Sequence, residues 1–65
     1  MGIRYETYGE LPVKVRDEIM SLYGSSKIVD ESIPALGNRS MLELINEEGE
    51  EQLVEFLLKV RGKFT

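Results

Sequence analysis

The sequence predicts an all-α protein, a small bundle of three to four short helices in one domain. Three observations support this prediction. The apolar residues recur mostly at helical spacing, glycines and prolines divide the chain into short segments, and the apolar runs are only two or three residues long. The chain has 65 residues and no cysteine. No disulfide can therefore supplement its small core, and either compact helical packing or a partner must supply the missing stability.

Residues 1–10 are expected to form an N-terminal arm, and residues 11–65 the helical domain. In the arm, Ile3 and Tyr5 alternate with Arg4 and Glu6, which is typical of a short extended segment. A single strand is not stable by itself. The arm therefore either packs on the helices or stays loose, and pairing with a second copy is the less favoured alternative.

The first helix is expected over residues 11–23. Pro12 suits the first helical position, where its missing N–H is not needed, and Gly24 follows the helix as a left-handed C-cap. The apolar residues of this segment lie on one face of a helix with 3.6 residues per turn. They are Leu11, Val15, Ile19, Leu22 and Tyr23.

A structured turn is expected over residues 34–40, after a segment (25–33) that holds at most one or two helical turns. Gly37 and Asn38 are residue types that accept a positive φ. Ser40 and Glu43 have the spacing of a capping box, which starts a short apolar helix that Asn46 ends. The expected structural residues of the turn are Pro34, Gly37, Asn38 and Ser40.

The longest helix is expected over residues 47–61. Glutamates crowd its beginning and cations its end, which complements the helix macrodipole. Gly62 stands where a C-cap is expected, and Phe56 falls on the edge of the apolar stripe or outside it, as a candidate contact residue. The stripe consists of Leu53, Leu57, Val60 and Phe64, and is widened by Val54 and Leu58.

The composition argues against an enzyme. The chain has no histidine and no cysteine, so it has no ligands for a typical zinc or iron–sulfur site and no Ser–His or Cys–His pair. The glutamates of residues 47–51 are better explained as a solvated first helical turn than as an acid–base pair. We therefore expect no catalytic residues, no metal and no cofactor.

The charge pattern favours a protein partner over a nucleic acid or a membrane. Twelve acidic residues against eight basic ones give a net charge of −4, which disfavours binding to phosphate backbones. No apolar run is long enough to span a membrane, and the absence of cysteine fits the reducing cytoplasm. Lys59, Arg61, Lys63 and Phe64 form a basic, aromatic tail that suits an anionic cleft of a partner. The alternative is that these cations only offset the helix C-terminus while Phe64 folds back onto the core.

Four segments together resemble the toxin-binding domain of the Xre/MbcA/ParS antitoxin family. They are Leu-Tyr-Gly at 22–24, Ile-Pro-Ala-Leu-Gly-Asn-Arg-Ser-Met-Leu-Glu-Leu-Ile at 33–45, Glu-Glu-Gly at 47–49 and Val-Glu-Phe-Leu-Leu-Lys-Val at 54–60. Asn38 stands where the family has a second glycine, and Met41 where proline is common. The ten residues before Leu11 are too few for the helix-turn-helix domain that family members usually carry, so no DNA-linked role is expected of this chain alone.

The resemblance implies an antitoxin that binds a RES-domain toxin, an enzyme that consumes NAD, and sterically occludes its NAD pocket. The inhibitory contacts are then expected between Lys59 and Thr65, supported by the turn of Gly37, Asn38 and Arg39. For Arg39 a structural role, paired with a carboxylate such as Glu43, is favoured over a direct contact. The expected partner-binding residues are Arg39, Phe56, Lys59, Arg61, Lys63, Phe64 and Thr65. The alternative function is a small self-associating helical adaptor or regulator with another protein partner, with a homodimer as one form.

Overall fold

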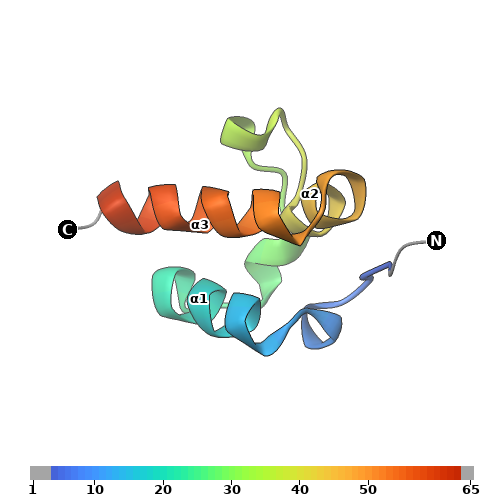
Figure 1. The fold of residues 1–65 in the computed structure, drawn as a ribbon, viewed down its shortest axis with the longest axis horizontal. Coiled ribbons are helices and arrows are strands. Elements are labelled where there is room, and N and C mark those ends of the chain that lie inside the picture. The colour runs from blue at the N-terminus through green and yellow to red at the C-terminus, as the bar shows by residue number, and fades with distance from the viewer. Residues whose placement is uncertain (1–3, 64–65) are drawn as a thin grey trace.

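The computed structural model describes residues 4–63, and this part of the chain is all helix, turn and loop, without a β-strand (Figure 1). The predicted all-α class is therefore confirmed. The α-helices are α1 (Val13–Tyr23), α2 (Met41–Glu48) and α3 (Glu50–Lys63). Three short 3-10 helices accompany them: η1 (Tyr8–Glu10), η2 (Lys27–Asp30) and η3 (Pro34–Leu36).

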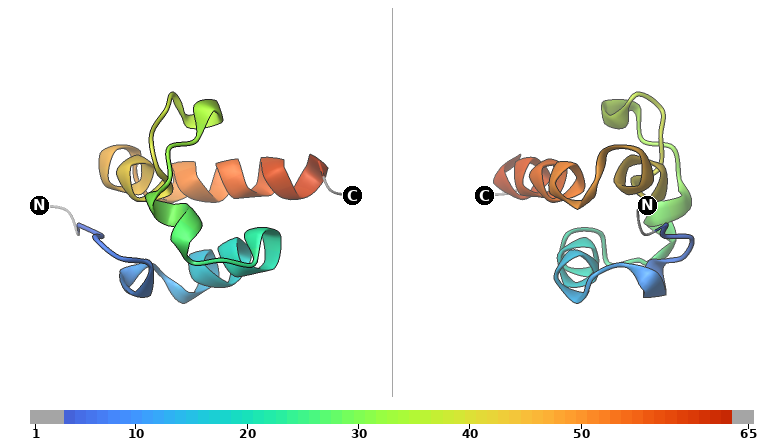
Figure 2. Two further views of the ribbon diagram at one scale, coloured as in Figure 1. Left: turned by 180° about the vertical axis from the view of Figure 1, so that it is seen from behind. Right: turned by 45° about the vertical axis from the view of Figure 1, so that its right-hand side comes forward.

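Helix α3 lies in the middle of the molecule. Helix α1 runs along one side of it in the same direction, and the loop that contains η3 lies on the opposite side (Figures 1 and 2). Helix α2 meets the beginning of α3 and packs against it more extensively than any other pair of elements. This arrangement leaves α3 with two separate lateral faces, one toward the loop and one toward α1.

One apolar core connects all these elements. Every helix except η1 contributes at least one buried side chain, and Leu53 and Leu57 of α3 are 0% and 1% exposed. The prediction that Leu58 widens the buried apolar stripe of α3 is wrong, because this side chain is 57% exposed beside α1. The buried apolar residues are Leu11, Val15, Ile19, Val29, Leu36, Met41, Leu42, Leu44, Ile45, Leu53 and Leu57.

Helix α1 begins and ends as its flanking residues dictate. Pro12 was expected at the first helical position, but it is the N-cap, and the helix starts one residue later at Val13. Gly24 has a φ of 68° and donates its N–H to the carbonyl of Met20 at 2.9 Å. The predicted left-handed C-cap is thus confirmed, and it satisfies a carbonyl that the last turn otherwise leaves unpaired.

The expected end of the second helix at Asn46 is wrong, and the reason is a contact between distant parts of the chain. The Asn46 side chain accepts a hydrogen bond from the Tyr5 N–H at 2.8 Å and donates one to the Tyr5 carbonyl at 2.7 Å. Helix α2 therefore continues to Glu48, and Gly49 with a φ of 101° makes the sharp link to α3. Gly62 is likewise not a C-cap, since it lies inside α3.

The two Asn46 bonds also answer the question of whether the N-terminal arm is packed or loose at Tyr5. From there the arm turns through η1, where the Tyr8 hydroxyl donates to the carbonyl of Arg16 at 2.9 Å. Tyr5 and Tyr8 both pack partly buried against the core. The described part of the arm therefore belongs to the folded unit.

Replacing Leu53 with alanine should destabilise the fold far more than the same change at Leu58. Leu53 is fully buried, so its truncation leaves a cavity and should lower the free energy of unfolding by about 2–5 kcal/mol. Leu58 is largely exposed, so its truncation should cost about 0.5 kcal/mol or less. Urea unfolding followed by circular dichroism measures both, and equal losses contradict the assigned core.

Replacing Asn46 with alanine should release the arm from α2. The free energy of unfolding should fall by about 1 kcal/mol. The Tyr5 amide should also lose its protection against hydrogen exchange. The matched control is Gln52→Ala, which changes an exposed amide on α3. A Tyr5 amide that stays protected in the Asn46 variant contradicts the hydrogen bonding between Asn46 and Tyr5.

Candidate partner-binding groove

The turn between η3 and α2 is built by backbone conformations that its sequence favours. Pro34 occupies the first turn of η3, and Gly37 and Asn38 follow with φ angles of 72° and 64°. The chain closes on itself at Ile33, whose N–H donates to the carbonyl of Arg39 at 3.0 Å and whose carbonyl accepts from Asn38 at 3.1 Å. The predicted positive φ at both positions is confirmed.

Ser40 and Glu43 form the predicted capping box. The Ser40 hydroxyl accepts a hydrogen bond from the Glu43 N–H at 3.1 Å, and the Glu43 carboxylate accepts one from the Ser40 N–H at 2.9 Å. These bonds satisfy donors that a helix start leaves unpaired. The box fixes where α2 begins and thereby ties the turn to the core.

Arg39 joins the turn to the end of α2. Its Nε donates to the carbonyl of Leu36 at 2.8 Å, and its Nη1 lies 2.9 Å from Glu47 Oε1 and 2.8 Å from Glu48 Oε2. The hydrogen bonds with Glu47 and then Glu48 raise the pKa of the Arg39 guanidinium above its ordinary value. The expected pairing with Glu43 is wrong, because the capping box already uses that carboxylate.

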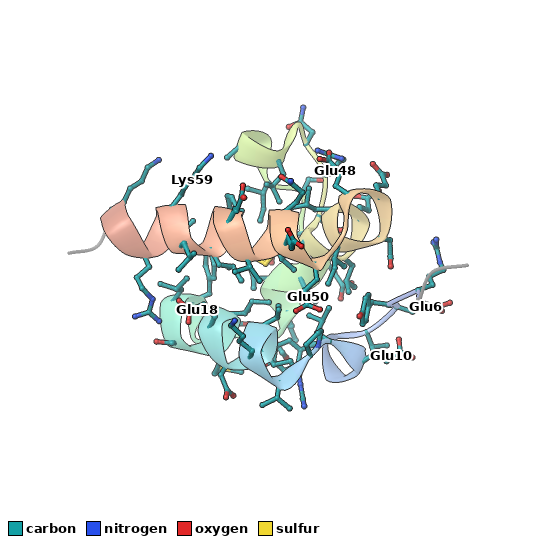
Figure 3. All side chains as sticks on the ribbon, in the orientation of Figure 1. Glu6, Glu10, Glu18, Glu48, Glu50 and Lys59 are labelled. Carbon is teal, nitrogen blue, oxygen red and sulfur yellow. The ribbon has the colours of Figure 1, made fainter. Side chains whose placement is uncertain are left out.

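A groove with a volume of about 650 Å³ lies between this turn and α3. Leu36, Phe56 and Val60 give it apolar side chains, while Lys59 and Lys63 place two cations at its end near the C-terminus. Figure 3 shows Lys59 and Glu48 on the side of α3 that carries the turn, and Glu18 and Glu50 on the side of α1. Further residues that line the groove are Ala35, Gly37, Arg39, Leu44, Glu48, Gln52 and Glu55.

Lys59 and Lys63 outnumber Glu55, which is the groove's one acidic residue outside the Arg39 ion pairs, so the groove keeps an excess of positive charge. Arg39 is largely neutralised by two glutamates, whereas neither Lys59 nor Lys63 forms an ion pair within residues 4–63. They stand one helical turn apart on α3 and are both exposed. A cationic rim beside apolar side chains can bind a protein segment that offers carboxylates and an apolar anchor.

The structure brings four of the predicted partner-binding residues together and separates a fifth. Arg39, Phe56, Lys59 and Lys63 line the groove. Arg61 instead pairs with Glu18 of α1, which raises the pKa of its guanidinium and keeps it on the opposite face. The remaining two predictions, Phe64 and Thr65, lie outside the described residues.

Some residues that line the groove were missed from the sequence. The sequence pattern does not single out Gln52, and it places Val60 only in the core stripe. Gln52, Phe56, Lys59 and Lys63 are spaced at i, i+4, i+7 and i+11, so the shared face was visible as a helical pattern. The contribution of Ala35 and Leu36 was not visible in this way, because it depends on how the turn packs against α3.

Metal-binding clusters and membrane-spanning helices are two further features that the described residues can be compared with. Within residues 4–63, no cluster of three or more acidic, histidine or cysteine side chains is placed to hold a metal ion. None of the helices of this part has the length and apolar character needed to cross a bilayer. Comparisons with protein-family models, with curated proteins and with solved structures found no match.

Replacing Gly37 with alanine should destabilise the turn although space for the methyl group exists. No atom lies within 4 Å of an added Cβ, but a φ of 72° is unfavourable for an L-residue, so the expected cost is about 1–2 kcal/mol. The control is Gly9→Ala, where φ is not positive and the added Cβ meets only the Thr7 hydroxyl at 4.0 Å. Urea unfolding compares the two, and an unchanged midpoint for the Gly37 variant contradicts the assigned turn.

Proposed function

We propose that this protein is antitoxin-like: it binds a RES-domain toxin, sterically occludes the toxin's NAD pocket and performs no reaction of its own. The observation that carries the proposal is the convergence of Arg39 with Phe56, Lys59 and Lys63 in one groove. Arg39 belongs to the 33–45 segment of the antitoxin resemblance and Phe56 and Lys59 to its 54–60 segment, while Lys63 follows one helical turn later. The resemblance supplies the identity of the partner, and the groove supplies a surface for it.

The groove suits an inhibitor that works by occupancy. Its apolar side chains can bury a partner side chain, which contributes most of the affinity in typical interfaces. Lys59 and Lys63 add attraction for carboxylates at the rim, which speeds association and fixes orientation. The turn opposite them is secured by the capping box and the Arg39 contacts. It is therefore already ordered and loses little conformational entropy when a partner binds.

Charge reversal at the two lysines should abolish neutralisation of the toxin. The double variant Lys59→Glu/Lys63→Glu is co-expressed with a RES-domain toxin, and its affinity for that toxin is measured by calorimetry. We expect at least about a tenfold weaker affinity, equivalent to about 1.4 kcal/mol, and loss of growth rescue. Phe56→Ala should weaken binding through lost apolar contact.

The matched control is Lys14→Glu, an exposed lysine on α1 that lies on the other side of α3. It should retain affinity and growth rescue, and circular dichroism should show the same helicity for all variants. The proposal fails if the unaltered protein neither binds the toxin nor relieves growth arrest. It also fails if Lys14→Glu weakens binding as much as the change in the groove.

A further inference from the structure

The face of α3 opposite the groove carries an apolar side chain that the fold does not cover. Leu58 is 57% exposed, and Val54 beside it is only partly buried. Between α1 and α3 lies a small, mainly apolar notch of about 50 Å³, lined by Lys14, Val15, Glu18, Val54, Leu57 and Leu58. A leucine beside such a notch can be covered by an apolar side chain that enters from outside.

The two charges that α3 contributes along this face, Glu51 and Arg61, are placed symmetrically about its apolar centre. Glu51, Val54, Leu58 and Arg61 are spaced at i, i+3, i+7 and i+10, so they lie within roughly 80° of arc on α3. An acidic residue therefore stands at one end of the apolar pair and a basic residue at the other. This pattern complements itself when two such helices meet in opposite directions.

We propose that a second copy of this chain docks on this face, with the two α3 helices antiparallel about a two-fold axis. Val54 then contacts Leu58 of the second copy, and Glu51 pairs with Arg61 of the second copy. Because the axis is two-fold, each contact occurs twice. A parallel pair instead places Glu51 against Glu51 and Arg61 against Arg61, which is repulsive.

The ion pair between Arg61 and Glu18 is compatible with this dimer. The contact with Glu18 is made through Nε of Arg61, and a guanidinium has five N–H donors that can serve two carboxylates. The face is small compared with the roughly 1,200 Å² that stable interfaces bury, so the dimer should be weak and concentration-dependent. It uses the side of α3 away from the groove and does not rest on the proposed toxin binding.

Sedimentation equilibrium from about 10 µM to about 1 mM tests the association. We expect a monomer–dimer equilibrium that Leu58→Glu weakens more than tenfold, because the variant places charge at the apolar centre. The matched control is Val13→Glu, which changes an equally exposed apolar residue on the outer face of α1. Monomers at every concentration, or equal effects of both variants, overturn the proposal.

Cysteine cross-linking tests the orientation, since the chain has no cysteine of its own. In the antiparallel pair, a mixture of Glu51→Cys and Arg61→Cys should form the mixed disulfide. Glu51→Cys alone should not, because its two copies are about 15 Å apart along the axis and a disulfide needs Cα atoms within about 7 Å. One Glu51–Arg61 pair remains intact in the mixed dimer.

Each outcome of the cross-linking experiment decides the matter. A mixed disulfide that exceeds both self-disulfides by at least about tenfold supports the dimer. Self-disulfides in equal amount indicate a parallel pair or random collision and overturn it. Lys59→Cys, on the groove side of α3, is the control for random collision and should stay reduced under the same mild oxidation.

Discussion

The burial of Leu53 and Leu57 along one face of α3 is the constraint on which the rest of the structure depends. These two side chains reach into the only sizeable apolar core that the described residues build, and they hold α3 between α1 and the 33–40 turn. Because a helix of 3.6 residues per turn buries one stripe, its two flanks remain available. The flank toward the turn becomes the groove, and the flank toward α1 carries Leu58.

The turn is fixed by local chemistry more than by its own burial. Gly37 and Asn38 supply the left-handed conformations, and the Ser40–Glu43 box anchors the start of α2. Arg39 then ties the turn to the other end of α2 through Glu47 and Glu48. Arg39 thus has a structural contribution, and it lines the groove from this fixed position.

Local patterns in the sequence predicted what depends on neighbouring residues, and they failed where distant residues meet. Helical spacing found all three α-helices, and the glycine and serine positions predicted the turn. Asn46 was expected to end a helix, whereas its side chain bonds to Tyr5 and the helix continues. Nothing in the sequence indicates this contact between residues 41 positions apart. Similarly, proximity in the sequence predicts an ion pair of Arg39 with Glu43, whereas Arg39 pairs with Glu47 and Glu48. The separation of Arg61 from Lys59 and Lys63 depends on which flank of α3 meets α1, which the sequence alone does not show.

We propose that this chain acts by presenting the groove to a protein partner. The most direct measurement is a titration of the isotope-labelled chain with an unlabelled RES-domain toxin, followed by amide NMR signals. We expect the changes to concentrate on residues 35–39 and on Gln52, Phe56, Lys59 and Val60, while the amides of α1 stay unchanged. Changes centred on α1, or no change at a saturating toxin concentration, would contradict it.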